Sequence, residues 1–371
     1  MEYKRLGDIA SYINGYSFKP EDRGTEGLPI IRIQDLTGNA YDLGFYNGDY
    51  PERIEINDGD VLISWSASLG VYLWDRGKAL LNQHIFKVVF DKCAVDKQYF
   101  IYAIQHKLKE MESKTHGATM KHIVKKDFDD TVIPFPSLEQ QVEIASTLSK
   151  AANICKMHHH QLSSLDDLIK ARFVEMFDLD NCKWGTFGEN TDFIDYRGHT
   201  PELSRDGTIR MINAKSVGKG FFKYVDEYVT EEIYESWMHR GFGYPGDILF
   251  VTEGHTFGNT CLIPSGLNKF ALGQRVITIK AHKGLLTNAF LCSYMQTDRF
   301  WKDINVYRTG GTAQGIRSKD LVKVRIPLAP IKDQKKFSAF VLQIDKSKSA
   351  IQKSLDETQL LFDSLMHQYF G

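Results

Sequence analysis

Two stretches of the sequence place basic, hydroxyl and amide side chains on glycine-containing segments, a combination that suits phosphate oxygens and base edges. The first lies around "GATMKHIVKKDF", beginning at Gly117, and the second around "GGTAQGIRSKDL", beginning at Gly310, an interval of 310 − 117 = 193 residues. The candidate binding residues are Lys114, Lys121, His122, Lys125 and Lys126 in the first stretch and Arg308, Thr312, Gln314, Arg317 and Lys319 in the second. For either stretch alone, a solvated basic loop is the stronger interpretation. The recurrence favours binding.

A third segment, "TDFIDYRGHTPE" (191–202), adds Arg197 and His199 beside a proline turn. A structural turn explains these two residues about as well as binding does.

Other segments recur in the same order, which indicates that a large unit has been duplicated. "GDVLIS" (59–64) matches "GDILFV" (246–251), and the shared Gly-Asp is interpreted as a structural turn. "LNQHIFKV" (81–88) matches "LGQRVITI" (272–279). "PIIRIQDL" (29–36) matches "TIRMINAK" (208–215) with Arg32 opposite Arg210, and Gln141 lies opposite Gln334 in the proline-containing segments that follow.

The elements that position these residues fall into two kinds. Residues 1–136 and 179–329 contain short β-branched and aromatic runs separated by Gly, Asp and Asn clusters, which predicts two mostly-β globular domains. Helical stretches near 96–113 and 287–304 make each domain α+β.

Residues 137–178 and 330–371 contain almost no Gly or Pro and predict two long helices. In the second, apolar residues recur at alternating steps of four and three, as in a coiled-coil seam. The seam positions are Phe337, Val341, Ile344, Lys348, Ile351, Leu355, Thr358, Phe362, Leu365 and Tyr369. They span about 48 Å at 1.5 Å per residue. We expect the two helices to pair as an antiparallel coiled coil, giving the chain an internal pseudo-two-fold repeat.

Composition limits the class of protein. The 371 residues suffice for two domains, and the proportions of 42% hydrophobic and 25% charged residues are ordinary for a globular protein. The sequence has neither the apolar core of a signal peptide at its start nor the roughly 18 apolar residues of a membrane span. The five cysteines never occur as Cys-x-x-Cys, which favours reduced thiols in a cytoplasmic protein. The net charge of −1 counts mildly against nucleic acid, although a local basic patch suffices.

Known catalytic patterns are missing from the sequence. It contains no phosphate-binding loop, no dinucleotide-binding fingerprint and no Asn-Pro-Pro-aromatic segment of the kind that adenine methyltransferases use. We therefore predict no catalytic residue and no metal site in this chain.

The chain resembles the specificity subunits of type I restriction-modification systems. The residues that carry the resemblance are Pro134, Pro136, Leu138, Glu139, Gln140 and Gln141 at the start of the first long helix, with Gly311, Thr312 and Ile316 in the second glycine-containing stretch. The "GDVLIS" and "GDILF" runs, the segment at 195–201 and the terminal "SLMHQYF" add to it. The resemblance covers essentially the whole chain, although the second helix begins "PIKDQKK" where the first begins "SLEQQVE".

The resemblance implies that each globular domain recognises one half of a bipartite, asymmetric site in double-stranded DNA. The paired helices would set the spacer between the halves and dock two methyltransferase subunits. Those subunits would bind S-adenosylmethionine and flip out an adenine for N6 methylation. Two motor-nuclease subunits, which would use ATP and Mg²⁺, would join for restriction. This chain would hold no cofactor.

Two other classes of protein remain as alternatives. One is a duplicated coiled-coil adaptor that scaffolds proteins and binds no DNA. The other is a self-sufficient DNA methyltransferase, against which the missing cofactor motifs argue.

Overall fold

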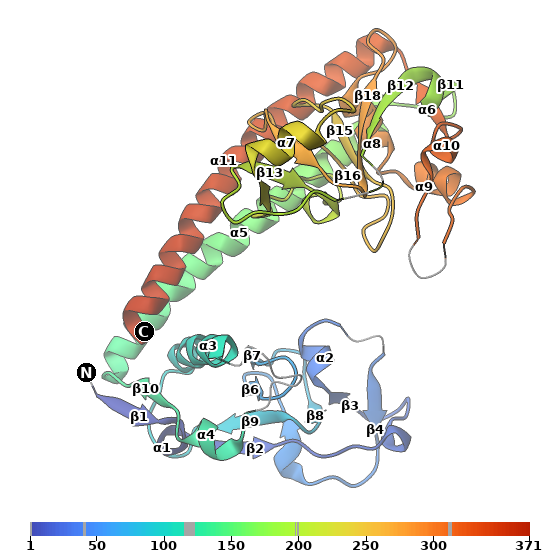
Figure 1. Ribbon diagram of the computed structural model, residues 1–371. Helices are drawn as coiled ribbons and strands as arrows, with labels where there is room; N and C mark the ends of the chain where they lie inside the picture. Colours follow the sequence, from blue (N-terminus) through green and yellow to red (C-terminus); the bar gives the residue numbers. More distant parts are fainter. Residues whose placement is uncertain (1, 40–41, 115–122, 197, 199, 311–313) are drawn as a thin grey trace. The chain divides into compact units, whose positions relative to one another are not determined.

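The computed structural model describes residues 2–39, 42–114, 123–196, 198, 200–310 and 314–371. The chain divides into two compact units (Figure 1). Unit 1 comprises residues 1–158 and 354–371, and unit 2 comprises residues 159–353. Each unit therefore contains one globular part together with a portion of both long helices.

The globular part of unit 1 is built on three small sheets. Their strand orders are β2-β9-β6-β7, β4-β3-β8-β5 and β1-β10. The strands are β1 (Tyr3–Arg5), β2 (Ser11–Asn14), β3 (Leu28–Ile31), β4 (Gly44–Tyr46), β5 (Glu55–Ile56), β6 (Val61–Ser64), β7 (Gly70–Leu73), β8 (Ala79–Leu81), β9 (Ile85–Val89) and β10 (Val132–Pro134). The helices are α1 (Leu6–Ile9), α2 (Ile33–Leu36), α3 (Lys97–Lys114) and α4 (Lys125–Asp129), with 3-10 turns at Pro20–Asp22 and Glu52–Ile54.

Unit 2 has corresponding sheets with strand orders β12-β18-β15-β16, β14-β13-β17 and β11-β19, and among the described residues the second of them has three strands where unit 1 has four. The strands are β11 (Lys183–Thr186), β12 (Thr191–Asp195), β13 (Ile209–Ile212), β14 (Tyr228–Val229), β15 (Ile248–Val251), β16 (Thr260–Leu262), β17 (Phe270–Leu272), β18 (Val276–Ala281) and β19 (Arg325–Leu328). The helices are α6 (Phe187–Asn190), α7 (Glu231–Trp237), α8 (Asn288–Tyr294), α9 (Asp298–Asn305) and α10 (Ser318–Leu321), with a 3-10 turn at Ala214–Ser216.

The helical stretch expected near 287–304 is two helices, α8 and α9, where unit 1 has the single helix α3. The break occurs at Thr297, whose backbone is extended and whose hydroxyl accepts the Phe300 N–H. Threonine at an N-cap satisfies a donor that would otherwise be unpaired, so it favours a new helix start here.

The Gly-Asp pairs that precede the central strands β6 and β15 form turns, as the sequence predicts. Gly59 and Gly246 have φ angles of 87° and 85°, a region that glycine adopts without steric cost. The next residues, Asp60 and Asp247, each accept the backbone N–H three residues earlier, at 2.8 and 2.9 Å. The same turn chemistry thus starts the central strand of both units.

The strand register corrects one part of the sequence alignment. Ile30 lies beside Leu80 on the parallel strands β3 and β8, and Met211 lies beside Ala271 on the equivalent strands β13 and β17. Ile30 therefore corresponds to Met211, so the alignment of Arg32 with Arg210 was wrong by three residues. The shared Ile-Arg dipeptide produced the error, because strands this short hold too few residues to fix a register by sequence.

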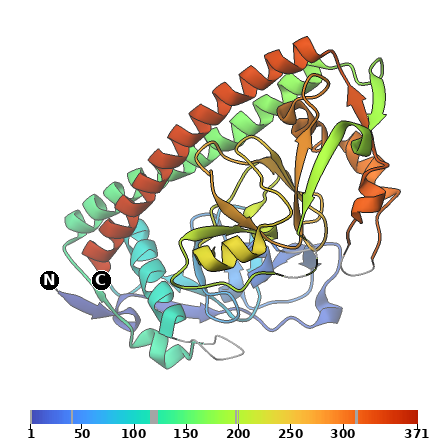
Figure 2. The same ribbon diagram turned by 45° about the horizontal axis from the view of Figure 1, so that its top comes forward.

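The two long helices are α5 (Leu138–Met176) and α11 (Ile331–Phe370), and they run antiparallel (Figures 1 and 2). In unit 1, the first part of α5 lies with the last part of α11, and in unit 2 the opposite parts lie together. All ten predicted seam positions of α11 are buried or half-buried. Among the described residues, no helix has the length and apolar character needed to cross a membrane.

Each long helix begins beside the globular part that precedes it in sequence and ends in the core of the other unit. α5 follows the globular part of unit 1, yet its Phe173 and Phe177 are buried in the core of unit 2. α11 follows the globular part of unit 2, yet its Met366 and Phe370 are buried in the core of unit 1. Each unit therefore depends on a helix that arrives from the other.

A buried glutamine joins each long helix to its globular part. The Gln141 amide donates to the Pro136 carbonyl (2.9 Å), and its oxygen accepts the Asp96 N–H at the start of α3 (3.0 Å). In unit 2, the Gln334 amide donates to the carbonyls of Ala329 and Leu285, and its oxygen accepts the Thr287 N–H. These side chains are 1% and 0% exposed, and their own polar atoms are hydrogen-bonded to backbone groups, as buried polar side chains usually are.

Gln141→Ala is expected to lower the free energy of unfolding of unit 1 by about 1–3 kcal/mol, because it removes two hydrogen bonds, from the Asp96 N–H and to the Pro136 carbonyl, each contributing about 0.5–1.5 kcal/mol. Urea unfolding measures this change. Glu143→Ala is the matched control, since Glu143 is exposed on the same helix and should change stability by less than about 0.5 kcal/mol. Equal effects of the two changes would contradict the structural role of Gln141.

Candidate nucleic-acid interface

In unit 1, the first glycine-containing stretch is attached to the end of the central strand β6. Trp65, the residue after that strand, donates its N–H to the His84 carbonyl (3.2 Å). Its own carbonyl accepts the Ile123 N–H (3.0 Å), which fixes the stretch at this residue. The Trp65 indole N–H also donates to the Asn14 side-chain oxygen (3.3 Å).

In unit 2, the second stretch is attached in the same way to the end of β15. Thr252 donates its N–H to the Arg275 carbonyl (2.9 Å), and its carbonyl accepts the Ile316 N–H (2.9 Å). The duplicated fold thus places Ile123 and Ile316, one described residue of each stretch, at equivalent positions. The backbone attachments are the same, whereas the side chains at those positions differ between the units.

The loop between β15 and β16 (252–259) is the centre of this region in unit 2. The Gly254 N–H donates to the Gln314 carbonyl (2.9 Å), so the loop and the second stretch are joined directly. Arg275 and Glu253, both exposed, form an ion pair of 3.1 Å beside them. A backbone held on both sides can present exposed side chains in a defined orientation.

Asp195 connects the end of β12 to the same region. Its carboxylate accepts a hydrogen bond from the Ser318 hydroxyl (2.6 Å), at the start of α10. Hydrogen bonding from Lys323 and Arg317 lowers the pKa of the neighbouring Asp320 carboxyl, so this group stays ionised. The exposed Arg317 guanidinium forms an ion pair with this carboxylate at 2.9 Å.

The predicted binding residues differ in their surroundings, and some of them lie outside the described part of the chain. Among the exposed ones, Lys125 pairs with Asp129 (2.6 Å), Arg308 donates to Asn305 (3.3 Å), and Lys126 and Lys319 lie on α4 and α10. Lys114 is the last residue of α3, and Gln314 is half-buried. Lys121, His122, Arg197, His199 and Thr312 lie outside the described residues. The assignment of these residues to binding stays a prediction.

Sequence reasoning missed a β-hairpin at 217–222 that lies against the 252–259 loop. Val217 and Phe222 form its bridge, and the Gly220 N–H donates to the Thr260 carbonyl (2.8 Å). The Asn259 side-chain amide donates to the Val217 carbonyl (3.0 Å). The signal was present in "GKGFFKY" (218–224), where lysines alternate with aromatic residues around a Lys-Gly tip.

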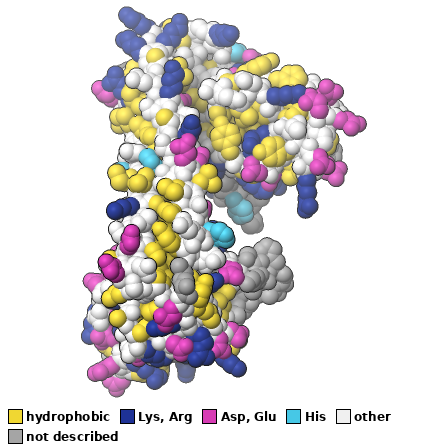
Figure 3. All heavy atoms as spheres, turned by 90° about the vertical axis from the view of Figure 1, so that its left-hand side faces the viewer, with side chains coloured by type: hydrophobic (Ala, Val, Ile, Leu, Met, Phe, Trp, Pro, Cys, Tyr) yellow, Lys and Arg dark blue, Asp and Glu magenta, His cyan; other side chains and the backbone are white. Residues whose placement is uncertain are grey.

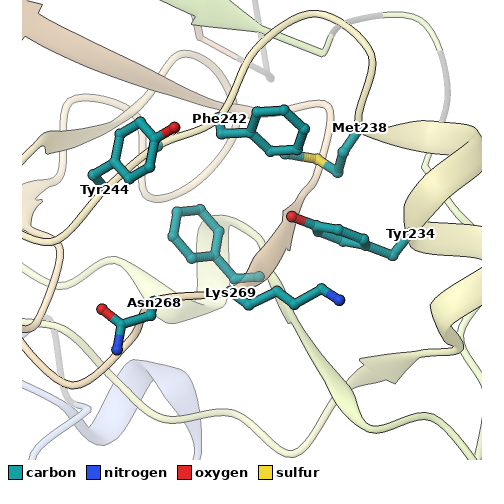
Figure 4. Close-up of a pocket in the computed structure, with 8 residues that line it drawn as sticks. Tyr234, Met238, Phe242, Tyr244, Asn268 and Lys269 are labelled. Atoms are coloured by element: carbon teal, nitrogen blue, oxygen red, sulfur yellow. The ribbon is translucent and has the colours of Figure 1, made fainter.

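The two units differ strongly at another equivalent position, next to the first residue of β8 or β17. In unit 2, a cavity of about 290 Å³ is lined by aromatic side chains, including Tyr234, Phe242 and Tyr244, with Lys269 at its rim (Figure 4). In unit 1, the equivalent cavity of about 660 Å³ is polar and is lined by acidic residues, with Lys78 in the position of Lys269. The duplicated units have thus diverged in surface chemistry while keeping their fold.

A family model described as the type I restriction modification DNA specificity domain matches residues 1–166 and 184–358. The chain therefore belongs to the family of type I restriction-modification specificity subunits, the non-catalytic recognition subunits of such systems, with two target recognition domains. This membership confirms the resemblance noted in the sequence and disfavours both alternative classes of protein.

Several curated relatives are similar to the chain. It is 24% identical to the MjaVIII specificity subunit of Methanocaldococcus jannaschii, covering 95% of this chain and 89% of that subunit. It is 24% identical to a putative specificity subunit of Haemophilus influenzae over 96% of this chain and 90% of that one. A 30% identical match to the EcoBI specificity subunit of Escherichia coli spans 38% of this chain and only 30% of that subunit.

Solved structures support the same fold. The S subunit of a type I system from M. genitalium superposes with a TM-score of 0.57 at 17% identity, covering 100% of this chain and 96% of that one. A chain from a study of complex assembly and conformational transition in the type I system superposes with a TM-score of 0.51 at 15% identity, covering 99% and 97%. The two-domain α+β architecture with antiparallel long helices is thereby confirmed.

Proposed function

We propose that unit 1 and unit 2 each recognise one half of a bipartite, asymmetric double-stranded DNA target. The observation that carries this proposal is the pair of backbone hydrogen bonds repeated at Trp65 and Thr252, which holds Ile123 and Ile316 of the two recurring stretches at equivalent positions. The two units share these backbone attachments but differ in the side chains nearby, which suits two half-sites of different sequence. The basic and amide residues named above would contact phosphates and base edges there.

The long helices would set the separation of the half-sites and dock two methyltransferase subunits. Those subunits would bind S-adenosylmethionine and methylate an adenine at N6, and two motor-nuclease subunits using ATP and Mg²⁺ would join for restriction.

Exposed apolar side chains on the helices of unit 1 support docking, since water-exposed apolar surface marks interaction sites (Figure 3). They are Leu138, Val142, Ile154, Met157, Leu360 and Leu361.

The assignment is tested by long-read detection of N6-methyladenine in the genomic DNA of the host, with and without this gene. We expect methylation to disappear at a single motif made of two short specified halves separated by an unspecified spacer. Unchanged methylation, even when the associated methyltransferase is overproduced, would remove DNA specificity as the function.

The double variant Leu360→Lys and Leu361→Lys is expected to abolish co-purification with the methyltransferase subunit, because two charges would enter an apolar contact. These side chains are 71% and 55% exposed, so the stability of the free chain should stay within about 0.5 kcal/mol of the parent. Leu73→Lys, on the globular part of unit 1, is the control and should leave co-purification intact. Retained binding by the helix variant would place the methyltransferase elsewhere.

A further inference from the structure

The two units carry opposite net charges. Unit 1 holds 19 lysines and arginines against 25 aspartates and glutamates, a net charge of −6. Unit 2 holds 27 against 22, a net charge of +5. The total of −1 conceals this difference. Because cationic side chains release counterions from DNA phosphates, the two units are expected to contribute unequally to DNA affinity.

Part of the positive charge of unit 2 is concentrated in residues 215–224, which we call the lysine hairpin. At its tip, the Gly218 N–H donates to the Phe221 carbonyl (2.8 Å), and Gly220 has a φ angle of 86°. The Lys223 N–H donates to the Ser216 carbonyl (2.8 Å) and closes the base of the hairpin. Together with the bonds to Thr260 and Asn259 described above, these contacts fix the hairpin beside the 252–259 loop.

The lysine hairpin presents cations and aromatic rings to solvent. Lys219 and Lys223 are exposed, and among the described residues neither forms an ion pair with a carboxylate, whereas Lys215 is paired with Glu227 (2.6 Å). Phe221 is 40% exposed and Tyr224 is 62% exposed, and the Lys223 ammonium lies 5.4 Å from the Phe221 ring centre. Unpaired cations next to exposed rings are the residue types that bind nucleic-acid backbones and stack on bases.

Unit 1 has no equivalent of this cationic segment. The register of β3 with β4 and of β13 with β14 makes residues 33–43 the counterpart of 214–226. Residues 33–43 contain Asp35 and Asp42 and no lysine or arginine. Asp42 is paired with Arg23 at 3.1 Å, and Asp35 with Arg32 at 2.9 Å. The aspartates thus neutralise the basic side chains that lie near this segment.

We propose that the lysine hairpin binds DNA phosphates next to the recognition loops of unit 2, and that unit 2 therefore supplies most of the sequence-independent affinity of the chain for DNA. Unit 1 would contribute through its sequence-specific contacts. This inference rests on the proposed DNA-binding function, and it adds an asymmetry that the duplication alone does not imply.

The test measures DNA affinity of the full-length chain as a function of salt, by fluorescence anisotropy, between about 50 and 200 mM. The probes are a labelled duplex carrying the motif found by methylation mapping and a scrambled duplex of the same length. The variant is Lys219→Ala with Lys223→Ala. Each lost phosphate contact should reduce the slope of log affinity against log salt by about 0.9. The two substitutions together should therefore reduce the slope by about 1.8. Across this fourfold salt range, the salt-induced loss of affinity should then be about tenfold smaller than in the parent.

Two control variants separate charge from position. Lys219→Arg with Lys223→Arg keeps the charge and should restore the parental slope. Lys19→Ala with Lys109→Ala removes two exposed lysines from unit 1 and should leave the slope unchanged. The hairpin variant should weaken binding to both duplexes equally, because phosphate contacts carry no sequence information.

The proposal is overturned if the hairpin variant keeps the parental slope while still preferring the motif, or if the unit 1 control lowers the slope as much. Either result leaves the proposed function standing. If the parental chain shows no preference for the motif at any salt concentration, the proposed function fails together with the inference.

Discussion

Replacement of Phe370 by alanine is expected to lower the free energy of unfolding of unit 1 by about 3–5 kcal/mol, the usual cost of removing a buried phenyl ring. Phe370 is 1% exposed, and its ring centre lies 5.3 Å from that of Tyr99. The residue belongs to a helix that reaches this core after the whole of unit 2 in sequence. The loss should therefore appear in unit 1 although α11 begins in unit 2.

Hydrogen exchange separates the two units in this experiment. Amides of β6 and β9 should lose protection in the Phe370→Ala variant, whereas amides of β15 and β18 should keep most of theirs. Leu360→Ala is the matched control on the same helix, since Leu360 is 71% exposed and packs against little. An unchanged stability of unit 1 in Phe370→Ala would show that the end of α11 does not complete its core.

Removal of one heptad from both long helices is expected to shorten the spacer of the DNA target without changing either half-site. Asp166 on α5 pairs with Lys348 on α11 at 2.5 Å, which sets residues 162–168 opposite 346–352. These two segments contain none of the residues proposed to dock the methyltransferase. Seven residues account for about 10 Å of helix, equivalent to at most about three base pairs at 3.4 Å each. Methylation mapping measures the new spacer.

Two comparisons sharpen the heptad experiment. Removal of the segment from α5 alone should destabilise the chain, because it shifts the apolar seam against an unchanged partner helix. Alanine substitutions at the exposed positions of the same segments keep the length and should keep the spacer. If the paired deletion yields an active protein with the original spacer, the helices do not set that distance.

The sequence predicted the features that depend on local chemistry. The Gly-Asp turns at Gly59 and Gly246, the heptad seam of α11 and the recurrence of Ile123 and Ile316 are all properties of short segments. Such signals survive without knowledge of tertiary contacts, because turn geometry, helix periodicity and repeated spacing can be recognised directly.

Features that depend on distant partners could not be predicted in this way. The correct correspondence of Met211 with Ile30 appears only when β17 and β8 are seen beside them. The 217–222 hairpin is attached to Thr260, about forty residues later in the chain. The position of its lysines beside the 252–259 loop therefore could not be predicted from the hairpin sequence itself. Burial of Phe177 and Phe370 in opposite units likewise depends on helix pairing across nearly two hundred residues.

The exchange of helix ends between the units has a consequence for biosynthesis. The globular part of unit 1 leaves the ribosome first, but Met366 and Phe370 of its core follow only after all of residues 159–353. Until then, apolar surface around Tyr99 and Tyr102, which contact Phe370 and Phe362, stays uncovered, and nascent chains that expose such surface are prone to aggregate. Unit 2, by contrast, is contiguous and can complete its core as it emerges. The first unit to be translated is thus the last to mature.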